Sequence, residues 1–509
     1  MKWKTSRTWH GSLVWLMLSG AAVALSSGRI SLALPAWLVP FFALRFIQTS
    51  PYLLRKRLTR LFLIFWVALS ATWYGATPLW GLPHFVFMAV NAGFTLLPYA
   101  AYTILRRHLP PSFLSTLIFP AAVVAVEWLT ILGSPFGSFG AGAYSQYGVL
   151  PLLQLLSIGG VLALTFLMAW TGAVAEWALQ AHRAGRRWIV PAAVWAMVMI
   201  VVFAWGLVQL QSDAASSEGS GDASTEGAAP VSVMGLTAQE VSMHELMPLL
   251  EEDPAAFRGR TAEIHRDYLE TSESAARNGV DLLVWPELAG VGTISDVEAL
   301  TDRAAKIAGR HGIWMVVPTM ALDPTGAQQA VNRAVLLGPN GSTLAEHVKF
   351  GGNFMEGTLP GDRQITVADT AIGRIGLAIC WDADFPEVVS QAGRESVDIL
   401  VVPAADWSGI DPLHGRMALF RAVENGTTLL RQAQGGLSIV ADPYGRVLDR
   451  GSGPRNEVRA VVSPASVPTI YPRIGNILGP VSAAFVLLTA LLVILRKRKV
   501  APAVAAASL

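Results

Sequence analysis

The sequence has a single cysteine and little charge, and each scarcity excludes a class of protein. With only Cys380, the chain cannot form an intrachain disulfide, so a disulfide-stabilised scaffold is excluded. No cluster of Cys and His has the spacing of a zinc site, and we expect neither a metal nor another cofactor. Asp, Glu, Lys and Arg make up 15% of the 509 residues, well below the share of about a quarter in soluble domains. The formal net charge of +2, without a Lys/Arg cluster that has aromatic residues between its members, argues against nucleic acid as a partner.

Hydrophobic residues are abundant instead, at 52%, and many of them stand in long runs. Most of these runs have about the 20 residues that a helix needs to cross a bilayer. We expect about eight membrane spans, near residues 11–27, 30–48, 60–76, 84–105, 113–132, 155–179, 188–210 and 474–495. The first run follows basic residues, as in a signal peptide, but further runs follow it at once, so we interpret it as a retained span.

Basic residues mark alternate loops between these runs. Lys and Arg precede the first run and lie between the second and third, the fourth and fifth, and the sixth and seventh. The intervening loops 77–83 and 133–154 contain none, and only Arg29 departs from the pattern. Because Lys and Arg collect on the cytoplasmic side of membrane proteins, we expect a cytoplasmic N-terminus and a chain that is outside the membrane at residue 211. The basic run 496–499 after the last span then places the C-terminus in the cytoplasm as well.

Composition divides the chain into five segments. Residues 211–230 are rich in Ser, Gly, Ala and Asp and cannot bury enough apolar surface to fold, so we expect a flexible linker there. The predicted segments are a transmembrane domain of about seven spans at 1–210, the linker at 211–230, an extracytoplasmic α/β domain at 231–470, a transmembrane helix with a basic cytoplasmic end at 471–499, and a tail at 500–509.

Strand and helix patterns alternate within the α/β domain. We expect helices at 296–310 and 412–424, and a hairpin within 331–349 that turns at Pro339-Asn-Gly341. The other expected strands lie at 282–285, 314–317, 364–380, 398–402, 427–441 and 446–449. Because helices alternate with strands early and hairpins come later, these patterns predict a mixed sheet with helix-covered faces.

Cys380 lies at the end of a short apolar strand, where a rigid sheet can present a nucleophile to a cleft. The alternative is a buried structural cysteine, since free Cys is among the most buried residue types. Glu287 and Lys349 also follow expected strands. A thiol attacks as a thiolate, a carboxylate can take its proton and later return it, and an ammonium can stabilise the oxyanion of a tetrahedral intermediate. Spacing alone does not show that the three residues converge.

The sequences around these three residues resemble the Glu-Lys-Cys triad of the nitrilase, or carbon–nitrogen hydrolase, superfamily. The matching motifs are Trp285-Pro-Glu287, Lys349 after a hairpin with Glu356 seven residues on, Ile379-Cys-Trp-Asp-Ala-Asp-Phe-Pro386, and the segments 414–426 and 430–438. The resemblance implies a nitrilase-like α-β-β-α sandwich beside the multi-pass α-helical membrane domain. It also implies Glu287 as general base, Lys349 as oxyanion stabiliser and Cys380 as nucleophile.

The membrane part narrows the resemblance further. Seven spans, an exported nitrilase-like domain and a last span resemble the apolipoprotein N-acyltransferase family, as do the segments 127–128, 133–137 and 142–146. This resemblance implies a ping-pong transfer in which Cys380 takes an acyl chain from a membrane phospholipid as a thioester. The chain then passes to the α-amino group of the diacylglyceryl-cysteine of a bacterial lipoprotein. It further implies a monomer in the bacterial inner membrane, in contact with the lipid bilayer.

The sequence departs from the family pattern around the supporting residues. Trp381-Asp382 stands where the family usually has Tyr-Glu, and Asp382 keeps the carboxylate with a shorter reach. Lys349 is followed by Phe-Gly-Gly-Asn-Phe-Met-Glu356 rather than a Leu-Val-Pro-Phe-Gly-Glu-type run. We take Glu356, Trp381 and Asp382 as supporting or substrate-binding residues. A loop carboxylate is the alternative for Glu356, and Trp381 is either a packing residue or a wall of an acyl pocket.

Two other functions remain open at this point. One is a membrane-tethered amidase that uses the same triad on a small soluble amide, with water as acceptor. The many spans argue against it, because a hydrolase needs only one anchor. The other is a transporter or assembly factor with an inactive external domain, and the intact Glu, Lys and Cys argue against that. Outside the triad we interpret His414 as structural, Arg421 and Glu424 as an ion pair of a helix, and Glu127, costly to bury within a span, as a functional candidate.

Overall fold

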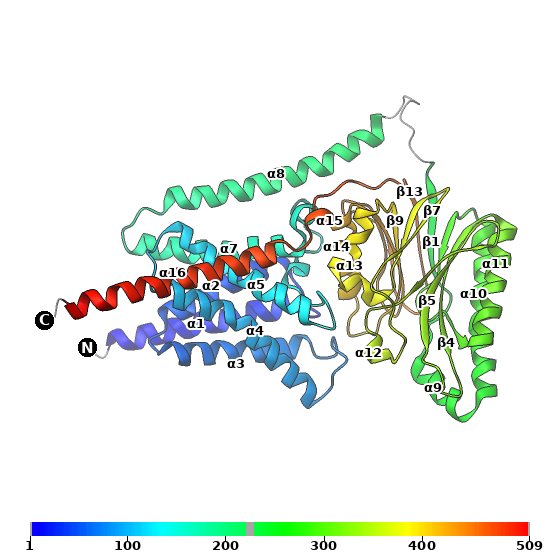
Figure 1. Ribbon diagram of the computed structural model, residues 1–509, viewed down its shortest axis with the longest axis horizontal. Coiled ribbons are helices and arrows are strands. Elements are labelled where there is room, and N and C mark those ends of the chain that lie inside the picture. The colour runs from blue at the N-terminus through cyan, green and yellow to red at the C-terminus, as the bar shows by residue number, and fades with distance from the viewer. Residues whose placement is uncertain (1–2, 220–228, 507–509) are drawn as a thin grey trace.

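The computed structural model describes residues 3–219 and 229–506, which form a helical half and a half built on two β-sheets (Figure 1). Both chain ends lie at the end of the helical half that is remote from the sheets (Figure 1). The long helices of this half are α1 (Trp3–Ser26), α2 (Ala33–Thr49), α3 (Leu54–Thr72), α4 (Leu82–Arg106), α5 (Ile118–Gly133), α7 (Leu156–Arg183), α8 (Ile189–Gly219) and α16 (Leu478–Ala506).

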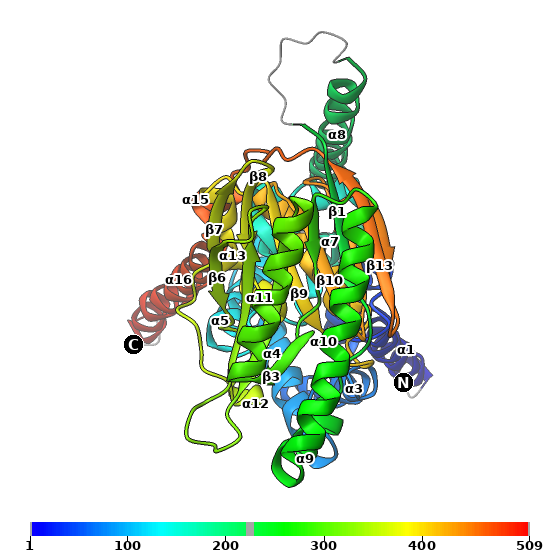
Figure 2. The same ribbon diagram turned by 90° about the vertical axis from the view of Figure 1, so that its right-hand side faces the viewer.

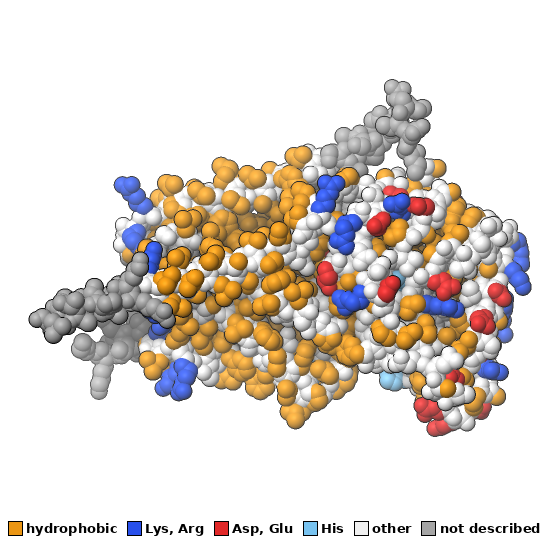
Figure 3. Space-filling model, in the orientation of Figure 1, with side chains coloured by type: hydrophobic (Ala, Val, Ile, Leu, Met, Phe, Trp, Pro, Cys, Tyr) orange, Lys and Arg blue, Asp and Glu red, His pale blue; other side chains and the backbone are white. Residues whose placement is uncertain are grey.

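Each of these helices contains one of the apolar runs of the sequence. Within the described residues, five helical segments are long and apolar enough to cross a membrane: 82–106, 113–133, 156–183, 189–211 and 478–497. The apolar stretches 11–26 and 33–49 are shorter, and α3 begins with a basic turn. Hydrophobic side chains cover the visible surface of the helical half, and Lys and Arg side chains lie at its end remote from the sheets (Figure 3). The chain is therefore a membrane protein.

The helices extend beyond two of the predicted boundaries. Helix α8 continues to Gly219, so the first part of the expected linker at 211–230 is helical, and strand β1 begins at Val231. Residues 220–228 of the expected linker lie outside the described residues. Helix α16 reaches Ala506, which includes most of the expected tail. Once a helix is nucleated each further residue adds a hydrogen bond, so a helix can continue past its last apolar residue.

Two mixed sheets form the other half. The first has the strand order β13-β1-β2-β4-β5-β6, with β3 paired to β4, and the second has the order β12-β11-β10-β9-β8-β7. The strands of the first sheet are β1 (Val231–Thr237), β2 (Leu282–Val284), β3 (Gly290–Thr293), β4 (Trp314–Leu322), β5 (Val331–Leu337), β6 (Thr343–Val348) and β13 (Asn456–Val462). Those of the second are β7 (Thr366–Thr370), β8 (Gly373–Leu377), β9 (Ile399–Ala405), β10 (Thr428–Gln434), β11 (Ser438–Ala441) and β12 (Val447–Gly451).

Alternating side chains of the strands build three apolar layers. Val316 of β4 packs between the sheets with Leu377 of β8 and Val401 of β9. Its neighbours Met315 and Val317 face the opposite way, toward α10 (Pro254–Arg277) and α11 (Ile294–His311). These two helices lie across the outer face of the first sheet (Figure 2). Helices α13 (Pro386–Arg394) and α14 (Leu413–Asn425) cover the second sheet, which completes the α-β-β-α sandwich and confirms the predicted fold class.

Helix α14 also joins the sandwich to the helical half. Its apolar residues belong to one buried cluster with the second sheet and with Tyr144 and Val161 of the helical half. The helix ends at Gly426, whose φ of +64° is left-handed. A Cβ there would lie 1.8 Å from the carbonyl oxygen of Val467, so only glycine fits. The sandwich is thus seated on the end of the helix bundle.

Most local predictions within the sandwich match the structure. The expected helices at 296–310 and 412–424 are α11 and α14, and the hairpin turns at Gly341 with a φ of +79°. Helix α10 and strand β13 were not predicted. The polar face of α10 is wide, and β13 alternates exposed and buried residues over a short stretch, so neither has a strong apolar signal.

Candidate active site

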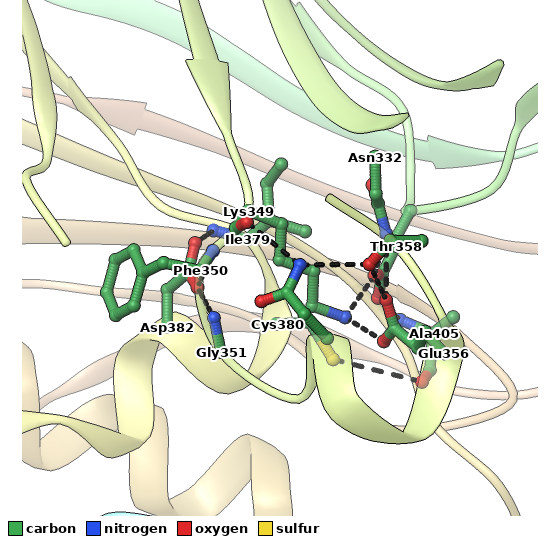
Figure 4. A network of polar contacts seen from close by, with 12 residues as sticks. Asn332, Lys349, Phe350, Gly351, Glu356, Thr358, Ile379, Cys380, Asp382 and Ala405 are labelled. Carbon is green, nitrogen blue, oxygen red and sulfur yellow. Dashed lines mark hydrogen bonds and ion pairs between the residues drawn. The ribbon is translucent and has the colours of Figure 1, made fainter. Parts of the chain in front are cut away.

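The three residues singled out from the sequence meet where strands of both sheets end. Glu287 follows β2, Lys349 follows β6, and Cys380 follows β8 in the turn η3 (Cys380–Asp384). Helix α12 (Asn353–Glu356) adds Glu356 from the loop after Lys349. The structure therefore brings Glu287, Lys349, Glu356 and Cys380 into one site, most of whose members are drawn in Figure 4.

Lys349 lies between two carboxylates. Its Nζ donates a hydrogen bond to Glu287 Oε1 at 2.6 Å and another to Glu356. Asn332 of β5 donates to Glu287 Oε1 at 2.7 Å, and the N–H of Ala405 donates to Glu287 Oε2 at 2.9 Å. Both oxygens of Glu287 are therefore fixed, and Lys349 is fully buried.

These contacts set the charge states of the site. Burial lowers the pKa of Lys349, but the negative charge of Glu287, together with that of Glu356, outweighs it, so the pKa lies well above its ordinary value. Burial raises the pKa of Cys380 well above its ordinary value, Glu287 raises it further, and Lys349 only partly opposes them. The site at neutral pH thus holds an ammonium and a protonated thiol, and the thiol needs a base before it can attack.

Cys380 itself stands in an unusual backbone conformation. Its φ of +50° lies in the left-handed region that residues other than glycine rarely adopt. The carbonyl oxygen of Ala405 lies 3.9 Å from its Sγ (Figure 4). Because the N–H of the same residue holds Glu287, Ala405 links the carboxylate to the thiol. A residue with such a strained backbone keeps its conformation only where surrounding contacts hold it. Cys380 therefore depends on the contacts of the turn η3.

Asp382 holds the turn from the side of the sandwich. Its Oδ1 accepts hydrogen bonds from the N–H groups of Phe350 at 3.0 Å and Gly351 at 2.6 Å. Its Oδ2 accepts from the N–H of Ile379 at 2.9 Å and lies 2.8 Å from His347 Nε2. One buried carboxylate thus ties the residues that follow Lys349 to the residue that precedes Cys380.

Replacing Asp382 by Asn should destabilise the protein while leaving its volume unchanged. An amide has one acceptor oxygen, so its NH2 group must face N–H donors on one side, at a cost of roughly 1–3 kcal/mol. For a domain of this size the midpoint of thermal unfolding should fall by about 5 °C. The matched control is Asp369→Asn, since Asp369 is exposed in its ion pair with Arg374 and should leave the midpoint unchanged. Equal midpoints for the two variants would contradict this role of Asp382.

A second buried ionic group lies close to Cys380. Ligand atoms of Cys380, Asp406 and His414 lie within 4.8 Å of one another, the one such group found among residues 3–219 and 229–506. The site does not suit a metal ion, because Arg431 Nη2 lies 2.8 Å from both oxygens of Asp406 and 3.2 Å from His414 Nδ1. The guanidinium already supplies the cation at this place.

The charges of this group are fixed by their pairing. Burial alone would raise the pKa of Asp406, but Arg431 and His414 lower it to about 2. Burial alone would lower the pKa of His414, but Asp384 and Asp406 raise it to about 9. His414 therefore has ion-pair partners on both ring nitrogens, at 2.7 Å from Asp406 and 3.3 Å from Asp384, in line with the structural interpretation from the sequence.

The loop 134–146 of the helical half, here called the docking loop, contacts the turn of Cys380 directly. The backbone N–H and the hydroxyl of Ser138 donate to the carbonyl oxygen of Asp384 at 2.7 and 2.8 Å. Phe136 and Phe139 both contact the Trp381 ring, at centroid distances of 5.1 and 5.8 Å; Phe136 meets it edge-on and Phe139 is stacked on it. Trp381 therefore packs against the membrane half of the protein.

Two adjoining cavities extend from this contact into the helical half. Trp381 lines a cavity of about 160 Å³ together with residues of the docking loop and of α4. A second cavity, of about 320 Å³, lies deeper among the helices and has Glu127 on its wall, where Thr165 donates to the carboxylate at 3.2 Å. The two cavities share the lining residues Asn91, Thr95, Thr130, Gly137, Phe139 and Gly140.

Sequence reasoning missed several members of the site. Asn332 and Ala405 hold Glu287, yet Asn332 is one polar residue within a strand and Ala405 acts through its backbone, which no motif reveals. Ser138 lies 246 residues from Asp384 in the chain. The ion pair expected between Arg421 and Glu424 is present at 3.1 Å, but Arg421 also donates to Tyr144 of the docking loop at 3.2 Å.

Comparison with known proteins matches both halves of the chain. The carbon–nitrogen hydrolase family matches residues 253–463, and the apolipoprotein N-acyltransferase N-terminal domain matches residues 19–174. The chain is similar to an apolipoprotein N-acyltransferase of Geobacter metallireducens, with 27% identity over 77% of this chain and 76% of that one. It is similar to one of Rhodopseudomonas palustris, with 25% identity over 86% and 83%. A deaminated glutathione amidase of Synechocystis sp. is 31% identical over 36% of this chain and 80% of its own length.

Proposed function

Because the chain belongs to the carbon–nitrogen hydrolase family and carries the N-terminal domain of apolipoprotein N-acyltransferases, we propose that it is a phospholipid-to-lipoprotein N-acyltransferase. The acyl donor is a membrane phospholipid, and the acceptor is the α-amino group of the N-terminal diacylglyceryl-cysteine of a bacterial lipoprotein. Glu287, Lys349 and Cys380 perform the chemistry, and one copy of the chain supplies all three.

In the first half-reaction Cys380 attacks the ester carbonyl carbon of the phospholipid. Glu287 takes the thiol proton, which the raised pKa of the buried thiol makes necessary. Lys349 stays an ammonium beside Glu287 and stabilises the oxyanion of the tetrahedral intermediate. The C–O bond then breaks, Glu287 returns the proton to the leaving oxygen, and a lysophospholipid departs from the thioester.

In the second half-reaction the α-amino group of the acceptor attacks the thioester carbon. Glu287 takes a proton from the nitrogen as the C–N bond forms. The C–S bond breaks, and the proton returns to the sulfur of Cys380, which leaves the free enzyme and an amide. Glu356 supports both steps, since its carboxylate is a second ion-pair partner of Lys349 beside Glu287.

The single observation that best supports a lipid substrate is the pair of cavities among the membrane helices. Trp381, the residue after the nucleophile, lines the nearer one, and its walls are mainly apolar side chains. An acyl chain on Cys380 could extend past Trp381 into this apolar space, which adjoins the second cavity of the helical half. The position of Trp381 supports a role as an acyl-pocket wall as well as a packing residue.

The surface supports an orientation for the proposed enzyme. The hydrophobic belt covers the helical half, and its Lys and Arg residues gather at the end remote from the sandwich, where both chain ends lie (Figures 1 and 3). By the positive-inside rule this end faces the cytoplasm, so all eight long helices cross the inner membrane and the sandwich lies outside it. A catalytic half that lies on the outer surface of the membrane can bind a phospholipid and a lipid-anchored protein without extracting either from the bilayer.

An amidase acting on a small soluble amide is the competing function, because the amidase relatives share the sandwich. Those relatives match only about a third of this chain, and the part that they match contains neither the membrane helices nor the docking loop. The cavities among the helices have no use in such a hydrolase.

The test is the intact mass of the purified protein after incubation with phospholipid vesicles. We expect a mass gain of one acyl chain, because a thioester forms before the acceptor arrives. A peptide that carries an N-terminal diacylglyceryl-cysteine should remove the gain and become acylated.

Cys380→Ala is the matched variant, and it should show no gain in mass, because the chain has no other cysteine. Ammonia release from small amides, without an adduct from lipid, would replace the acyltransferase by the amidase. An adduct that persists with the peptide would leave the donor correct and the acceptor wrong.

A further inference from the structure

The turn that carries Cys380 is held from two sides, and only one of them belongs to the sandwich. Asp382 anchors the turn to the residues around Lys349 and Ile379. The other side rests on the docking loop, which comes from the helical half. Cys380 needs such support, because its left-handed φ of +50° is unfavourable for a residue with a Cβ.

The backbone of the docking loop is in direct contact with the backbone of the turn at the carbonyl group of Asp384. Ser138 uses both its N–H and its hydroxyl on the Asp384 carbonyl, and its hydroxyl also contacts Tyr144 Oη at 2.6 Å. Gly137, with a φ of +54°, lies against the same carbonyl, and a Cβ at this position would be 2.3 Å from its oxygen. Glycine is therefore required both by the backbone conformation and by the contact.

The loop is itself fixed to the sandwich behind the site. Arg421 of α14 donates to Tyr144 Oη and is paired with Glu424, whose Oε1 accepts from the N–H of Val161 in α7. A buried polar network thus runs from a membrane helix through α14 and the docking loop to the turn of the nucleophile. The side chains of Ser138, Tyr144, Arg421 and Glu424 are all nine-tenths or more buried, so the contact between the docking loop and the sandwich is part of a packed, buried interface.

We propose that the docking loop is a working part of the catalytic centre, in which Ser138 and Gly137 position the turn that presents Cys380. The helical half would then do more than anchor the enzyme and hold lipid, since it completes the geometry of the nucleophile. Ser138 and Gly137 are positioning residues, because they act through the Asp384 carbonyl and touch no reacting atom. The inference rests on the proposed role of Cys380 as nucleophile.

Gly137→Ala tests the contact, and Gly148→Ala is its matched control. Both glycines have a positive φ, +54° for Gly137 and +86° for Gly148, so both substitutions carry a backbone penalty, which is no smaller in the control. A Cβ at Gly137 collides with the Asp384 carbonyl, whereas a Cβ at Gly148 meets nothing within 4 Å. Any difference between the two full-length variants therefore reports the collision with the turn.

We expect Gly137→Ala to lower kcat for acyl transfer by roughly 10²-fold with KM within about twofold, because a misplaced nucleophile loses alignment rather than affinity. Alkylation of Cys380 by iodoacetamide, followed by intact mass, should become several-fold faster as the buried thiol is released. The reaction is unambiguous because the chain has one cysteine. Gly148→Ala should behave as the unaltered protein in kcat and in alkylation rate, and it should melt at a higher temperature than Gly137→Ala, because only the Cβ at position 137 collides with backbone.

Two results would overturn the proposal: equal kcat and alkylation rates for the two glycine variants, or an unaltered kcat in Gly137→Ala. Should Gly137→Ala fail to fold, Ser138→Ala decides, because it removes one of the two hydrogen bonds to Asp384 without a collision. It should lower kcat several-fold, with rescue by Ser138→Thr, and an unaltered kcat would again refute positioning. If the protein without substitutions forms no adduct with lipid, the proposed acyltransferase is wrong. The loop can still be tested in that case, because alkylation of Cys380 needs no acyl substrate and its rate can be compared between Gly137→Ala and Gly148→Ala.

Discussion

Glu287→Gln should slow formation of the acyl adduct by roughly 10²–10⁴-fold, the range that general-base catalysis contributes. The glutamine nearly keeps the size of the side chain but cannot take the proton of Cys380. It also brings an NH2 group against N–H donors on at least one side, since Lys349 and Asn332 donate to one oxygen of Glu287 and Ala405 to the other. The measurement is the rate of mass gain with phospholipid vesicles at pH 7.

The same variant should make the thiol easier to ionise. After burial, the charge of Glu287 is the largest cause that raises the pKa of Cys380. Removal of that charge lowers the pKa, so the pH midpoint of iodoacetamide alkylation should move down while acyl transfer becomes slower. The control is Glu346→Gln, since Glu346 is a half-exposed carboxylate in an ion pair with Arg333 and should change neither quantity. An unaltered rate of acyl transfer in Glu287→Gln would exclude Glu287 as the base.

Lys349→Met should cost both activity and stability. Loss of the ammonium removes a donor to the oxyanion, which is expected to lower the rate of acyl transfer by at least roughly 10²–10³-fold. It also leaves Glu287 and Glu356 facing each other without the cation between them, and breaking a buried ion pair in this way costs about 3–5 kcal/mol. The two readouts are the rate of mass gain and the midpoint of thermal unfolding.

The control for this substitution is Lys306→Met, on the exposed face of α11. Loss of an exposed lysine usually changes the free energy of unfolding by less than about 0.5 kcal/mol. Lys306→Met should therefore keep both the rate and the midpoint. A Lys349→Met variant that formed the adduct at the normal rate would show that backbone groups alone stabilise the oxyanion.

Much of the architecture could be predicted from the sequence because its signals are local. The apolar runs mark every long membrane helix, and the Asn340-Gly341 turn fixes the hairpin that ends at Lys349. The expected starts of the linker and of the tail were less accurate, since α8 and α16 continue beyond their last apolar residues. Residue type and local motif also placed Glu287, Lys349 and Cys380 at strand ends, although only the structure brings them together.

The contacts that were not predicted join distant parts of the chain. Nothing around Ser138 indicates that it hydrogen-bonds a carbonyl 246 residues away, and nothing around Asn332 distinguishes it from any polar strand residue. Asp382 was predicted as a supporting or substrate-binding residue, and its hydrogen bonds to Phe350, Gly351 and Ile379 could not be read from its neighbours in the sequence. Such roles depend on the packing of one half against the other, which residue periodicity does not encode.

The seat of the sandwich on the end of the helix bundle has a consequence for kinetics. In the proposed acyltransferase, a site fixed at the membrane surface would encounter its lipid and lipoprotein substrates by lateral diffusion within one leaflet. The quantity that governs its encounter rate is then the mole fraction of donor and acceptor in the surrounding bilayer, not their amount per volume of suspension. Inert lipid would act as a diluent, and crowding of lipoproteins into a small area of membrane would raise the rate without any change in the number of molecules.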